Sequence, residues 1–257
     1  MVTVEILGSR QSFAPLASVV SVVTNDAVDG RSGYYCVTNT HQVVLGHELP
    51  SFREVQEAAA ASFSDSTVLA LAARFLGGNV GLGWAYRGYD LFVDLLSSAA
   101  QHNLRVGFYG GTAERLEQIN RKIALRLPEL NVSYCYSPPF RPLTPLEFES
   151  CVRDISDSGI DLLFVGIGCP KQEMFMHRFS KVKSGPTMIG VGAAFDFYAE
   201  VVSPSPPWVH RTGLEWLYRL CSEPRRLWRR YFEYNSKFIL YFTKQLVSHW
   251  YRNILRA

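Results

Sequence analysis

The sequence predicts an α/β fold: a Rossmann-like parallel sheet flanked by helices, with a basic and aromatic helical appendage at the C-terminal end. From residue 104 onward, short apolar runs alternate with amphipathic stretches at a spacing typical of right-handed βαβ units. Three of these runs end in glycines, and the last fifty or so residues are rich in Arg, Lys and aromatic residues. The proline-rich stretch 203–208 separates the two regions, so we expect a core at 1–202 and an appendage at 203–257.

The composition is that of a folded protein without metal or disulfide motifs. Of the 257 residues, 47% are apolar and 19% are charged, as in globular domains. The five cysteines form no C-x-x-C pair, the six histidines form no H-E-x-x-H motif, and no D-x-D is present. No run reaches the roughly 18 to 20 apolar residues of a membrane helix, and the first residues lack a signal-peptide pattern. We therefore expect a protein of the reducing cytosol with no cofactor and no essential metal.

The charge is divided unevenly along the chain. Residues 209–257 contain ten Lys or Arg against three Asp or Glu, whereas residues 1–208 contain sixteen against twenty. Eleven of the 34 aromatic residues lie within the last 44 positions. This asymmetry predicts an anionic partner for the appendage, such as a membrane surface, a diphosphate or a nucleic acid.

The second half of the core predicts four strands joined by helices. Apolar runs mark the strands, and Thr112 is placed to cap the first helix. The expected strands are 105–111, 131–136, 161–168 and 187–197, and the expected helices are 112–128, 144–159 and one that starts at Pro170. In the less periodic first hundred residues we expect a strand that runs into a helix near Thr40, a strand-to-helix junction at Asp65, and helices at 51–62 and 89–101.

Glycines at three predicted strand ends indicate a ligand site. Gly110 and Gly111, Gly166 and Gly168, and Gly190 and Gly192 follow these strands, and ligands of parallel sheets bind beyond the carboxyl ends of the strands. The chain has neither G-x-G-x-x-G nor a P-loop, which disfavours a nicotinamide cofactor. An ordinary βα turn is the alternative interpretation.

The stretch "GCPKQE" starts a helix whose free N–H groups suit an anion. Lys171 offers a charge there, and Gln172 offers both a donor and an acceptor. The alternative is a surface helix start, in which Glu173 simply favours the helix dipole. Cys169 is better explained as a small residue in a tight turn than as a nucleophile, because no base is tied to it.

Two aspartates are candidates for chemistry. Asp65 stands where a short strand gives way to a helix, so it is either a general base or a helix cap. Asp196 lies between two phenylalanines at a predicted strand end, where it is either a buried hydrogen-bond anchor or a site residue.

The appendage carries arginines at helical spacing. Arg219, Arg226 and Arg230 share one helix face if Pro224 does not interrupt the helix, and Arg225 and Arg229 form a second row. Arginine forks bind phosphates, and aromatic rings settle at the depth of lipid headgroups. The alternatives are a solvated basic helix that packs on the core through its aromatic residues, and a nucleic-acid-binding tail, for which no motif is present.

Together these stretches resemble the WecG/TagA/CpsF family of bacterial glycosyltransferases. The resemblance runs in order from about Val37 to Tyr231. It is carried by "TN…VV" near Asn39, "SDSTVLALAARFLG", "GYDL", "FYGGTAE", "DLLFVGIGCPKQE", "GVGAAFDF" and "GLEWLYRL…EPRRLWRRY".

The resemblance implies an inverting, metal-independent transfer of a hexose or N-acetylhexosamine from a UDP-sugar to a sugar on a polyprenyl diphosphate. It places the enzyme in the cytoplasm, peripherally at the inner face of the cell membrane, in cell-surface polysaccharide biosynthesis. Asp65 matches the proposed base. The donor would contact Thr38, Asn39, Arg87, Gly110, Gly111, Gly168, Lys171, Gln172 and Asp196. The acceptor diphosphate and the membrane would contact Arg219, Arg225, Arg226, Arg229 and Arg230.

The chain departs from the family pattern at several positions. Ser66 stands where the family usually has glycine after the aspartate, Glu200 replaces a glycine, and Pro204 replaces an arginine. A non-catalytic relative that binds a nucleotide sugar or a lipid diphosphate is therefore the alternative function. We expect no nucleic-acid partner. The oligomeric state, including a homo-oligomer, stays open.

Overall fold

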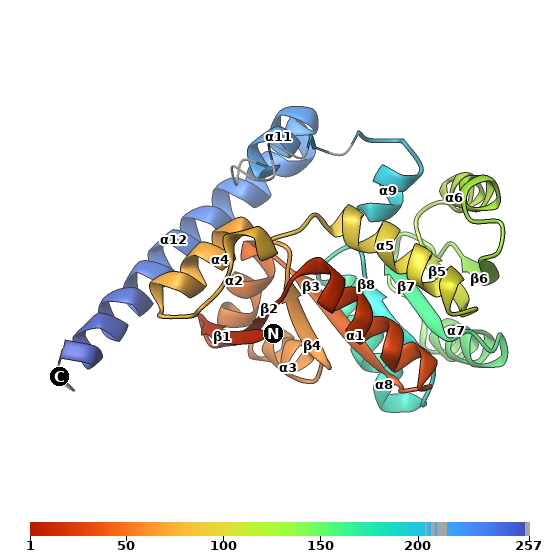
Figure 1. Ribbon diagram of the computed structural model, residues 1–257, viewed down its shortest axis with the longest axis horizontal. Helices are drawn as coiled ribbons and strands as arrows, with labels where there is room; N and C mark the ends of the chain where they lie inside the picture. The colour runs from red at the N-terminus through yellow and green to blue at the C-terminus, as the bar shows by residue number, and fades with distance from the viewer. Residues whose placement is uncertain (204, 207–208, 210–214, 255–257) are drawn as a thin grey trace. The chain divides into compact units, whose positions relative to one another are not determined.

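The computed structural model describes residues 1–203, 205–206, 209 and 215–254 (Figure 1). The chain has the predicted α/β fold, with mostly parallel strands flanked by helices and a long C-terminal helix. It divides into two compact units. Unit 1 comprises Met1–Leu16, Thr38–Arg87 and Ser205–Ala257, and unit 2 comprises Ala17–Val37 and Gly88–Pro204. The boundary predicted between residues 202 and 203 stays a prediction.

Unit 2 is built on a parallel sheet with the strand order β3-β8-β7-β5-β6. These strands are β3 (Gly33–Thr38), β5 (Arg105–Gly110), β6 (Asn131–Tyr136), β7 (Leu162–Gly166) and β8 (Thr187–Gly190). The helices are α1 (Leu16–Val28), α5 (Gly88–Gln101), α6 (Ala113–Arg126), α7 (Pro145–Asp157), α8 (Lys171–Val182) and α9 (Ala194–Tyr198). Every predicted strand and helix of residues 104–182 is present. Helices α6 and α7 each bury one apolar face and start after a Thr cap, whereas β5 and β7 are buried on both sides and end in glycine.

Aromatic side chains fill the interior of unit 2 on both faces of this sheet. Phe92 of α5 packs against Phe108 and Phe164 of the neighbouring strands β5 and β7, with ring centroids 6.2 and 5.1 Å away. On the other face, Tyr109 stacks on Phe175 of α8 at 4.2 Å. Successive residues of β5 therefore point to opposite sides, as the period of a strand requires, and each side is covered by a helix.

Unit 1 contains an antiparallel hairpin that the sequence reasoning did not predict. Strands β1 (Val2–Ile6) and β2 (Ser9–Phe13) form the hairpin, and β2 pairs in parallel with β4 (Ala61–Ser64). The other elements are α2 (Thr40–Glu48), α3 (Pro50–Glu57), α4 (Thr67–Phe75), the short 3-10 helix η1 (Leu82–Trp84), α11 (Glu215–Ser222) and α12 (Pro224–Ile254). The hairpin packs its apolar side chains against α2 and α4 in one core cluster.

Helix α12 is anchored in unit 1 along α2 (Figure 1). Phe238 is 4% exposed within the core cluster. Glu48 accepts hydrogen bonds from Lys237 Nζ at 3.2 Å and from Tyr241 Oη at 2.8 Å. The backbone N–H of Leu7 donates to Gln245 Oε1 at 2.9 Å. The basic, aromatic tail is thus an integral part of this unit, and one of its faces is already used for packing.

Three details correct the sequence expectations. The helix expected at 51–62 ends at Glu57, because Ala61 and Ser62 belong to strand β4. The strand expected at 187–197 ends at Gly190, and Asp196 lies in helix α9, not at a strand end. The reason is the turn at Gly192, whose φ of +53° turns the chain out of the sheet. Pro224 starts a new helix, so Arg219 lies in α11 and does not share a helix with Arg226 and Arg230.

Among the described residues, no helix is both long enough and apolar enough to cross a membrane.

Candidate functional site

The glycine-bearing strand ends of unit 2 lie side by side. Strand β7 is flanked by β5 and β8, with Gly110 in register with Gly166 and Val165 in register with Gly190. The backbones of β5 and β7 approach each other closely there, so that a Cβ added at Gly110 would lie only 2.5 Å from the carbonyl oxygen of Gly166. Since all three strands are parallel, the loops that follow them leave the sheet at the same edge, which is where such sheets bind ligands.

The turn after β7 leads directly into a helix N-terminus. Gly168 has a φ of +81°, and a Cβ placed there would meet nothing within 4 Å, so the turn borders open space. The Cys169–Pro170 peptide is cis. Helix α8 begins at Lys171, and the side chain of this lysine is exposed. In the first turn, the N–H of Gln172 donates to the carbonyl of Gly168 at 3.0 Å and that of Met174 to the carbonyl of Pro170 at 3.1 Å. The exposed Lys171 ammonium group and the positive end of the helix dipole suit an anionic group such as a diphosphate.

The two residues after Lys171 are buried and bonded to each other. Gln172 and Glu173 are 3% and 0% exposed. Gln172 Nε2 donates to Glu173 Oε1 at 2.9 Å, while the amide oxygen Oε1 of Gln172 is buried without a hydrogen-bond partner among the described residues. Burial raises the pKa of Glu173 to about 7, against hydrogen bonds from its own backbone, Gln172 and Cys169 that lower it. A buried carboxyl with a pKa near neutrality is typical of functional sites.

The turn after β5 also starts a helix. Gly111, with a φ of +71°, precedes Thr112, whose side chain accepts from the backbone N–H of Arg115 at 3.3 Å and so caps α6. Arg115 in turn forms an ion pair with Asp196 of α9, with 2.7 Å between Nη1 and Oδ1. Asp196 is therefore engaged with a cation, as the anchor interpretation expects, and its contact with a donor stays a prediction.

In unit 1, Asp65 lies directly after β4 at the start of α4. Its backbone N–H donates to the carbonyl of Thr38 at 3.2 Å. The cap of α4 is Ser66, which accepts from the N–H of Leu69, so the carboxylate of Asp65 is not the capping group. Tyr86 is 6% exposed, and its hydroxyl has no hydrogen-bond partner among the described residues. Burial first, and then the charge of Asp65, raise the pKa of this phenol well above its ordinary value.

Thr38 and Asn39 both have structural roles. The Thr38 hydroxyl, fully buried, donates to Phe63 O at 3.1 Å and to Gln11 Oε1. Asn39 caps α2 by accepting from the N–H of His41 at 3.1 Å, which leaves its amide NH2 group for another partner. Both positions at the end of β3 are thus held firmly, and their contacts with a donor stay predictions.

The arginines predicted for this region are in different environments. Arg87 Nη1 donates to the carbonyl of Ser205 at 2.6 Å. On α12, Arg225 and Arg229 are exposed, whereas Arg230 lies near His41 and has a buried Nε without a hydrogen-bond partner among the described residues. Burial first, and then the charge of Arg230, lower the pKa of His41 to about 4.

Two further arginines were predicted to contact the diphosphate of the acceptor substrate. Arg219 lies in α11, and its Nε is buried. The side chain of Arg226 lies outside the described part of the structure.

Glu200 occupies a backbone conformation that favours glycine. Its φ is +60°, in the left-handed region, which costs an ordinary residue roughly 1 to 2 kcal/mol. The carboxylate is paired with Lys122, which also donates to the carbonyl of Tyr198 at 3.1 Å. The fold at this position therefore explains the glycine of the family pattern, and Lys122 gives the substituted residue a compensating contact.

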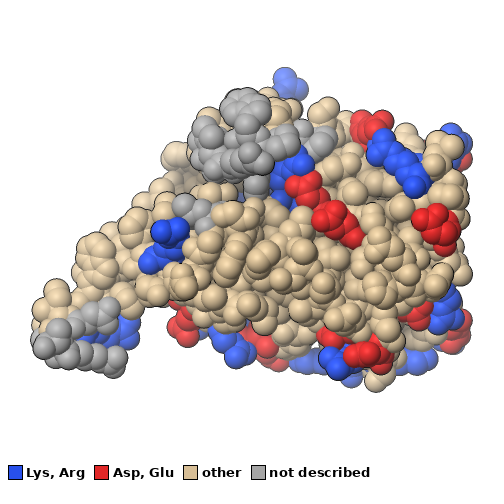
Figure 2. All heavy atoms as spheres, viewed as in Figure 1, with Lys and Arg blue, Asp and Glu red and all other residues tan. Residues whose placement is uncertain are grey.

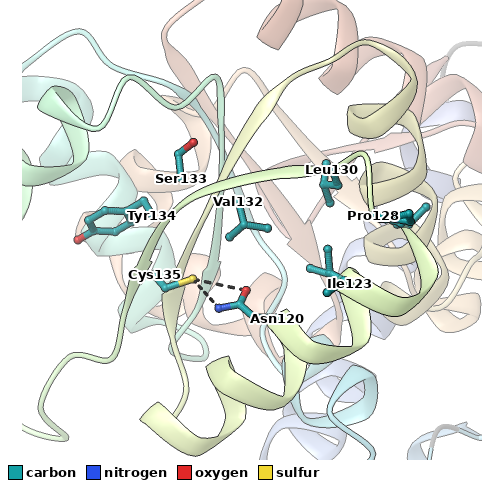
Figure 3. A pocket seen from close by; sticks show the side chains of 10 residues that line it. Asn120, Ile123, Pro128, Leu130, Val132, Ser133, Tyr134 and Cys135 are labelled. Atoms are coloured by element: carbon teal, nitrogen blue, oxygen red, sulfur yellow. Dashed lines mark hydrogen bonds between the residues drawn. The ribbon is translucent and has the colours of Figure 1, made fainter.

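An open hollow of about 440 Å³ lies between α6 and β6 and contains none of the predicted site residues (Figure 3). Ile123, Leu130 and Val132 give it an apolar floor, and Asn120 contacts the Cys135 thiol at 3.3 Å. Within the described ranges, no group of three or more His, Cys, Asp or Glu side chains could hold a metal ion.

Sequence reasoning missed four residues that the structure places at these positions: His41, Tyr86, Arg115 and Glu173. Arg115 occurs three residues into a capped helix, where spacing indicates only an exposed face. Glu173 entered the sequence analysis only in the alternative interpretation, as a surface carboxylate that favours the helix dipole. No local pattern in the sequence separates a buried acid at this position from an exposed one.

The buried carboxyl of Glu173 predicts a specific dependence of stability on pH. Because its folded-state pKa of about 7 exceeds the ordinary value of 4.5, its contribution to stability is complete below pH 4.5 and is lost as the pH rises through 7. One pKa unit corresponds to about 1.4 kcal/mol. Between pH 4.5 and pH 8, the free energy of unfolding of Glu173→Gln should therefore rise by about 3 kcal/mol relative to that of the wild type. Urea unfolding at both pH values measures this difference.

The control is Glu149→Gln, which removes a carboxylate from the exposed surface of α7. A difference between Glu173→Gln and the wild type that stays constant from pH 4.5 to pH 8 would contradict the buried, ionisable Glu173.

Comparison with known proteins agrees with the motifs. The "Glycosyl transferase WecG/TagA/CpsF family" matches residues 4–252. A Bacillus spizizenii protein named N-acetylglucosaminyldiphosphoundecaprenol N-acetyl-beta-D-mannosaminyltransferase is 29% identical over 217 residues, which cover 84% of this chain and 81% of that protein. A protein of the same name from Bacillus subtilis is 32% identical over 143 residues, 56% of this chain and 54% of that protein. The chain belongs to the WecG/TagA/CpsF family and is a glycosyltransferase.

Proposed function

We propose that the protein transfers a hexose or N-acetylhexosamine, with inversion, from a UDP-sugar to a sugar on a polyprenyl diphosphate during cell-surface polysaccharide biosynthesis. The observation that carries the donor half of this proposal is the common edge of β8, β7 and β5, where two glycine turns lead into the N-termini of α6 and α8. The acceptor half is supported by the names of the two relatives, which describe transfer to N-acetylglucosaminyl-diphospho-undecaprenol.

The diphosphate of the donor would bind at the helix N-termini of unit 2. The positive dipole ends of α6 and α8 and the exposed Lys171 favour an anion. As the sugar leaves, negative charge develops on the UDP oxygen, and the same groups stabilise it without a metal ion.

Asp65 would act as the general base. As the acceptor hydroxyl oxygen forms its bond to the anomeric carbon, the bond from that carbon to the UDP oxygen breaks, and the hydroxyl proton passes to the Asp65 carboxylate. The structure supports this role in two ways. Ser66, and not Asp65, caps α4, and the charge of Asp65 helps to raise the pKa of the buried Tyr86 phenol, so the two groups are close to each other.

The lipid end of the acceptor would be held by unit 1, at the membrane surface. Arg230 of α12 lies near His41 at the start of α2. Close by, the Thr40 hydroxyl donates a hydrogen bond to Asn235 Oδ1 of α12 at 3.2 Å. The Nε of the Arg230 guanidinium is buried without a hydrogen-bond partner in the described part of the chain, and such a donor suits a phosphate oxygen.

Helix α12 supports membrane contact through a second apolar face. Phe238 and its neighbours pack into the core of unit 1, but eight large apolar side chains of α12 are exposed. At 3.6 residues per turn they fall within an arc of roughly 140°, which also contains Arg225 and Arg229. These eight are Trp228, Phe232, Ile239, Leu240, Val247, Trp250, Tyr251 and Ile254.

The surface over α12 that faces the viewer in Figure 2 is mostly uncharged, with a few Lys or Arg side chains. Such a face is typical of helices that lie on anionic membranes. The peripheral location at the inner face of the membrane remains part of the proposal.

Asp65→Asn tests the reaction and the base together. With a panel of UDP-hexoses and UDP-N-acetylhexosamines, a polyprenyl-diphosphate sugar and EDTA, the wild type should release UDP from one donor. Asp65→Asn should lower turnover by about 10² to 10⁴ while the Kd for the UDP-sugar stays within about threefold. Asp157→Asn, an exposed aspartate of α7, is the matched control.

Loss of donor binding together with turnover in Asp65→Asn would argue against the base role. Retained UDP binding with no release across the whole panel would favour the non-catalytic relative.

The exposed face of α12 predicts how the protein binds membranes. Phe232→Ser/Ile239→Ser/Trp250→Ser removes side chains that are 75%, 66% and 54% exposed, so the fold should persist. Binding to vesicles of phosphatidylglycerol and phosphatidylcholine should weaken at least about tenfold, because each buried apolar side chain contributes on the order of 1 kcal/mol. Sedimentation with vesicles measures the effect.

A matched control changes three side chains that are at least as exposed elsewhere, in Leu125→Ser/Phe140→Ser/Leu146→Ser. Equal weakening in both triple variants would contradict a dedicated face. Stronger binding of the wild type to oligonucleotides than to vesicles would favour the nucleic-acid alternative.

A further inference from the structure

The Gln172 side chain fills the space that two glycines leave open at the end of β8. A Cβ at Gly190 would lie 2.7 Å from Gln172 Nε2, and one at Gly192 would lie 3.7 Å from Gln172 Oε1. Glycine at 190 therefore makes room for Gln172. The amide oxygen faces the half-exposed turn at Gly192, at the same sheet edge as the open turn of Gly168.

The amide oxygen of Gln172 is a buried hydrogen-bond acceptor. The side chain is 3% exposed, and Oε1 has no hydrogen-bond partner among the described residues. Leaving such an atom unsatisfied is unfavourable, so an arrangement that keeps it implies a ligand with an N–H or O–H group.

Glu173 determines which end of the Gln172 amide faces that ligand. Its Oε1 accepts from Gln172 Nε2 at 2.9 Å, and the ionised carboxylate offers acceptors only. The Gln172 NH2 group must then point to Glu173. Glu173 is itself fully buried and held by the Cys169 thiol, so the amide has little freedom to turn over.

We infer that Glu173 is a positioning residue, which orients Gln172 so that its amide oxygen accepts a hydrogen bond from an N–H or O–H group of the nucleotide-sugar donor. This inference rests on the proposed function, because the donor is the ligand in question. Three groups of a UDP-sugar have this chemistry: the N3–H of the base, the ribose hydroxyls, and the hydroxyl or acetamido group of the sugar.

A double-mutant cycle on the full chain separates positioning from simple structural support. Gln172→Met and Glu173→Met keep side-chain length and remove the polar groups. By titration calorimetry, Gln172→Met should weaken UDP-sugar binding about 10- to 100-fold, since the ligand donor loses its acceptor. Glu173→Met should weaken it less, and the double variant should match Gln172→Met within about twofold, because Glu173 acts through Gln172.

Glu173→Gln provides the conservative rescue. Its amide oxygen still accepts from Gln172 Nε2, so binding should stay within about threefold of the wild type. This variant also keeps the test decisive if Glu173→Met does not fold.

Four probes identify the donor group: UDP, N3-methyl-UDP, 2′-deoxy-UDP and UDP-N-acetylglucosamine. If the base N–H is the partner, N3-methyl-UDP should bind the wild type weakly. The wild type and Gln172→Met should then have the same affinity for this analogue. If the ribose 2′-hydroxyl is the partner, 2′-deoxy-UDP should bind the wild type weakly and should have the same affinity for Gln172→Met. A sugar group is indicated when the variants differ from the wild type only with the UDP-sugar.

Two results would overturn the inference. The positioning role is refuted if the losses of binding free energy in the two single variants add up in the double variant. It is also refuted if Gln172→Met binds all four probes as tightly as the wild type does. Both results leave the proposed function intact. If the wild-type protein binds none of the four, the uridine nucleotide donor fails as well.

Discussion

Close backbone contact between β5 and β7 fixes the geometry on which the rest of unit 2 depends. Gly110 and Gly166 lie in register, and no side chain fits between them. The Phe195 ring occupies the other side of Gly166, where a Cβ would be 2.5 Å from Cδ2. The two strands therefore end together, and the turns that follow them must diverge from one point. The N-termini of α6 and α8 therefore lie at the sheet edge where parallel sheets bind ligands.

Pairs of side chains then hold the turns in place. Arg115 links the first turn of α6 to Asp196 of α9, and Glu173 holds Gln172 against Gly190. These contacts are buried or half-buried, so each is more strongly defined than an exposed ion pair would be. In this arrangement, Gln172 Oε1 and Glu173 Oε2 are buried acceptors without a hydrogen-bond partner among the described residues, next to the start of α8.

Much of the fold could be predicted, because strong local signals mark it. Thr112 and Thr144 cap the helices that were expected after them, and Asn39 and Ser66 cap those that start near Thr40 and Thr67. The hairpin of β1 and β2 could not be predicted in the same way. Its second strand, "SRQSF", buries polar Ser9 and Gln11 in a network with Gln56, so it lacks the apolar alternation that indicates a strand.

The sequence was sufficient to predict the turns of the candidate site, but not which side chains contact one another there. Motif order located Asp65, the glycine turns and "KQE", whereas the burial of Glu173 depends on packing of α8 under the sheet, which no local pattern encodes. The tail illustrates the same limit. Composition predicted a basic, aromatic helix, but the division of α12 into a packed face with Phe238 and an exposed face with Phe232 is set by its contact with α2.

The central claim is that the common edge of β8, β7 and β5 binds the nucleotide. Hydrogen–deuterium exchange of the full chain with and without UDP tests it most directly. The account predicts slower exchange in peptides that cover 110–115, 166–173 and 190–193. UDP binding that leaves these segments unchanged and protects only residues elsewhere would contradict it.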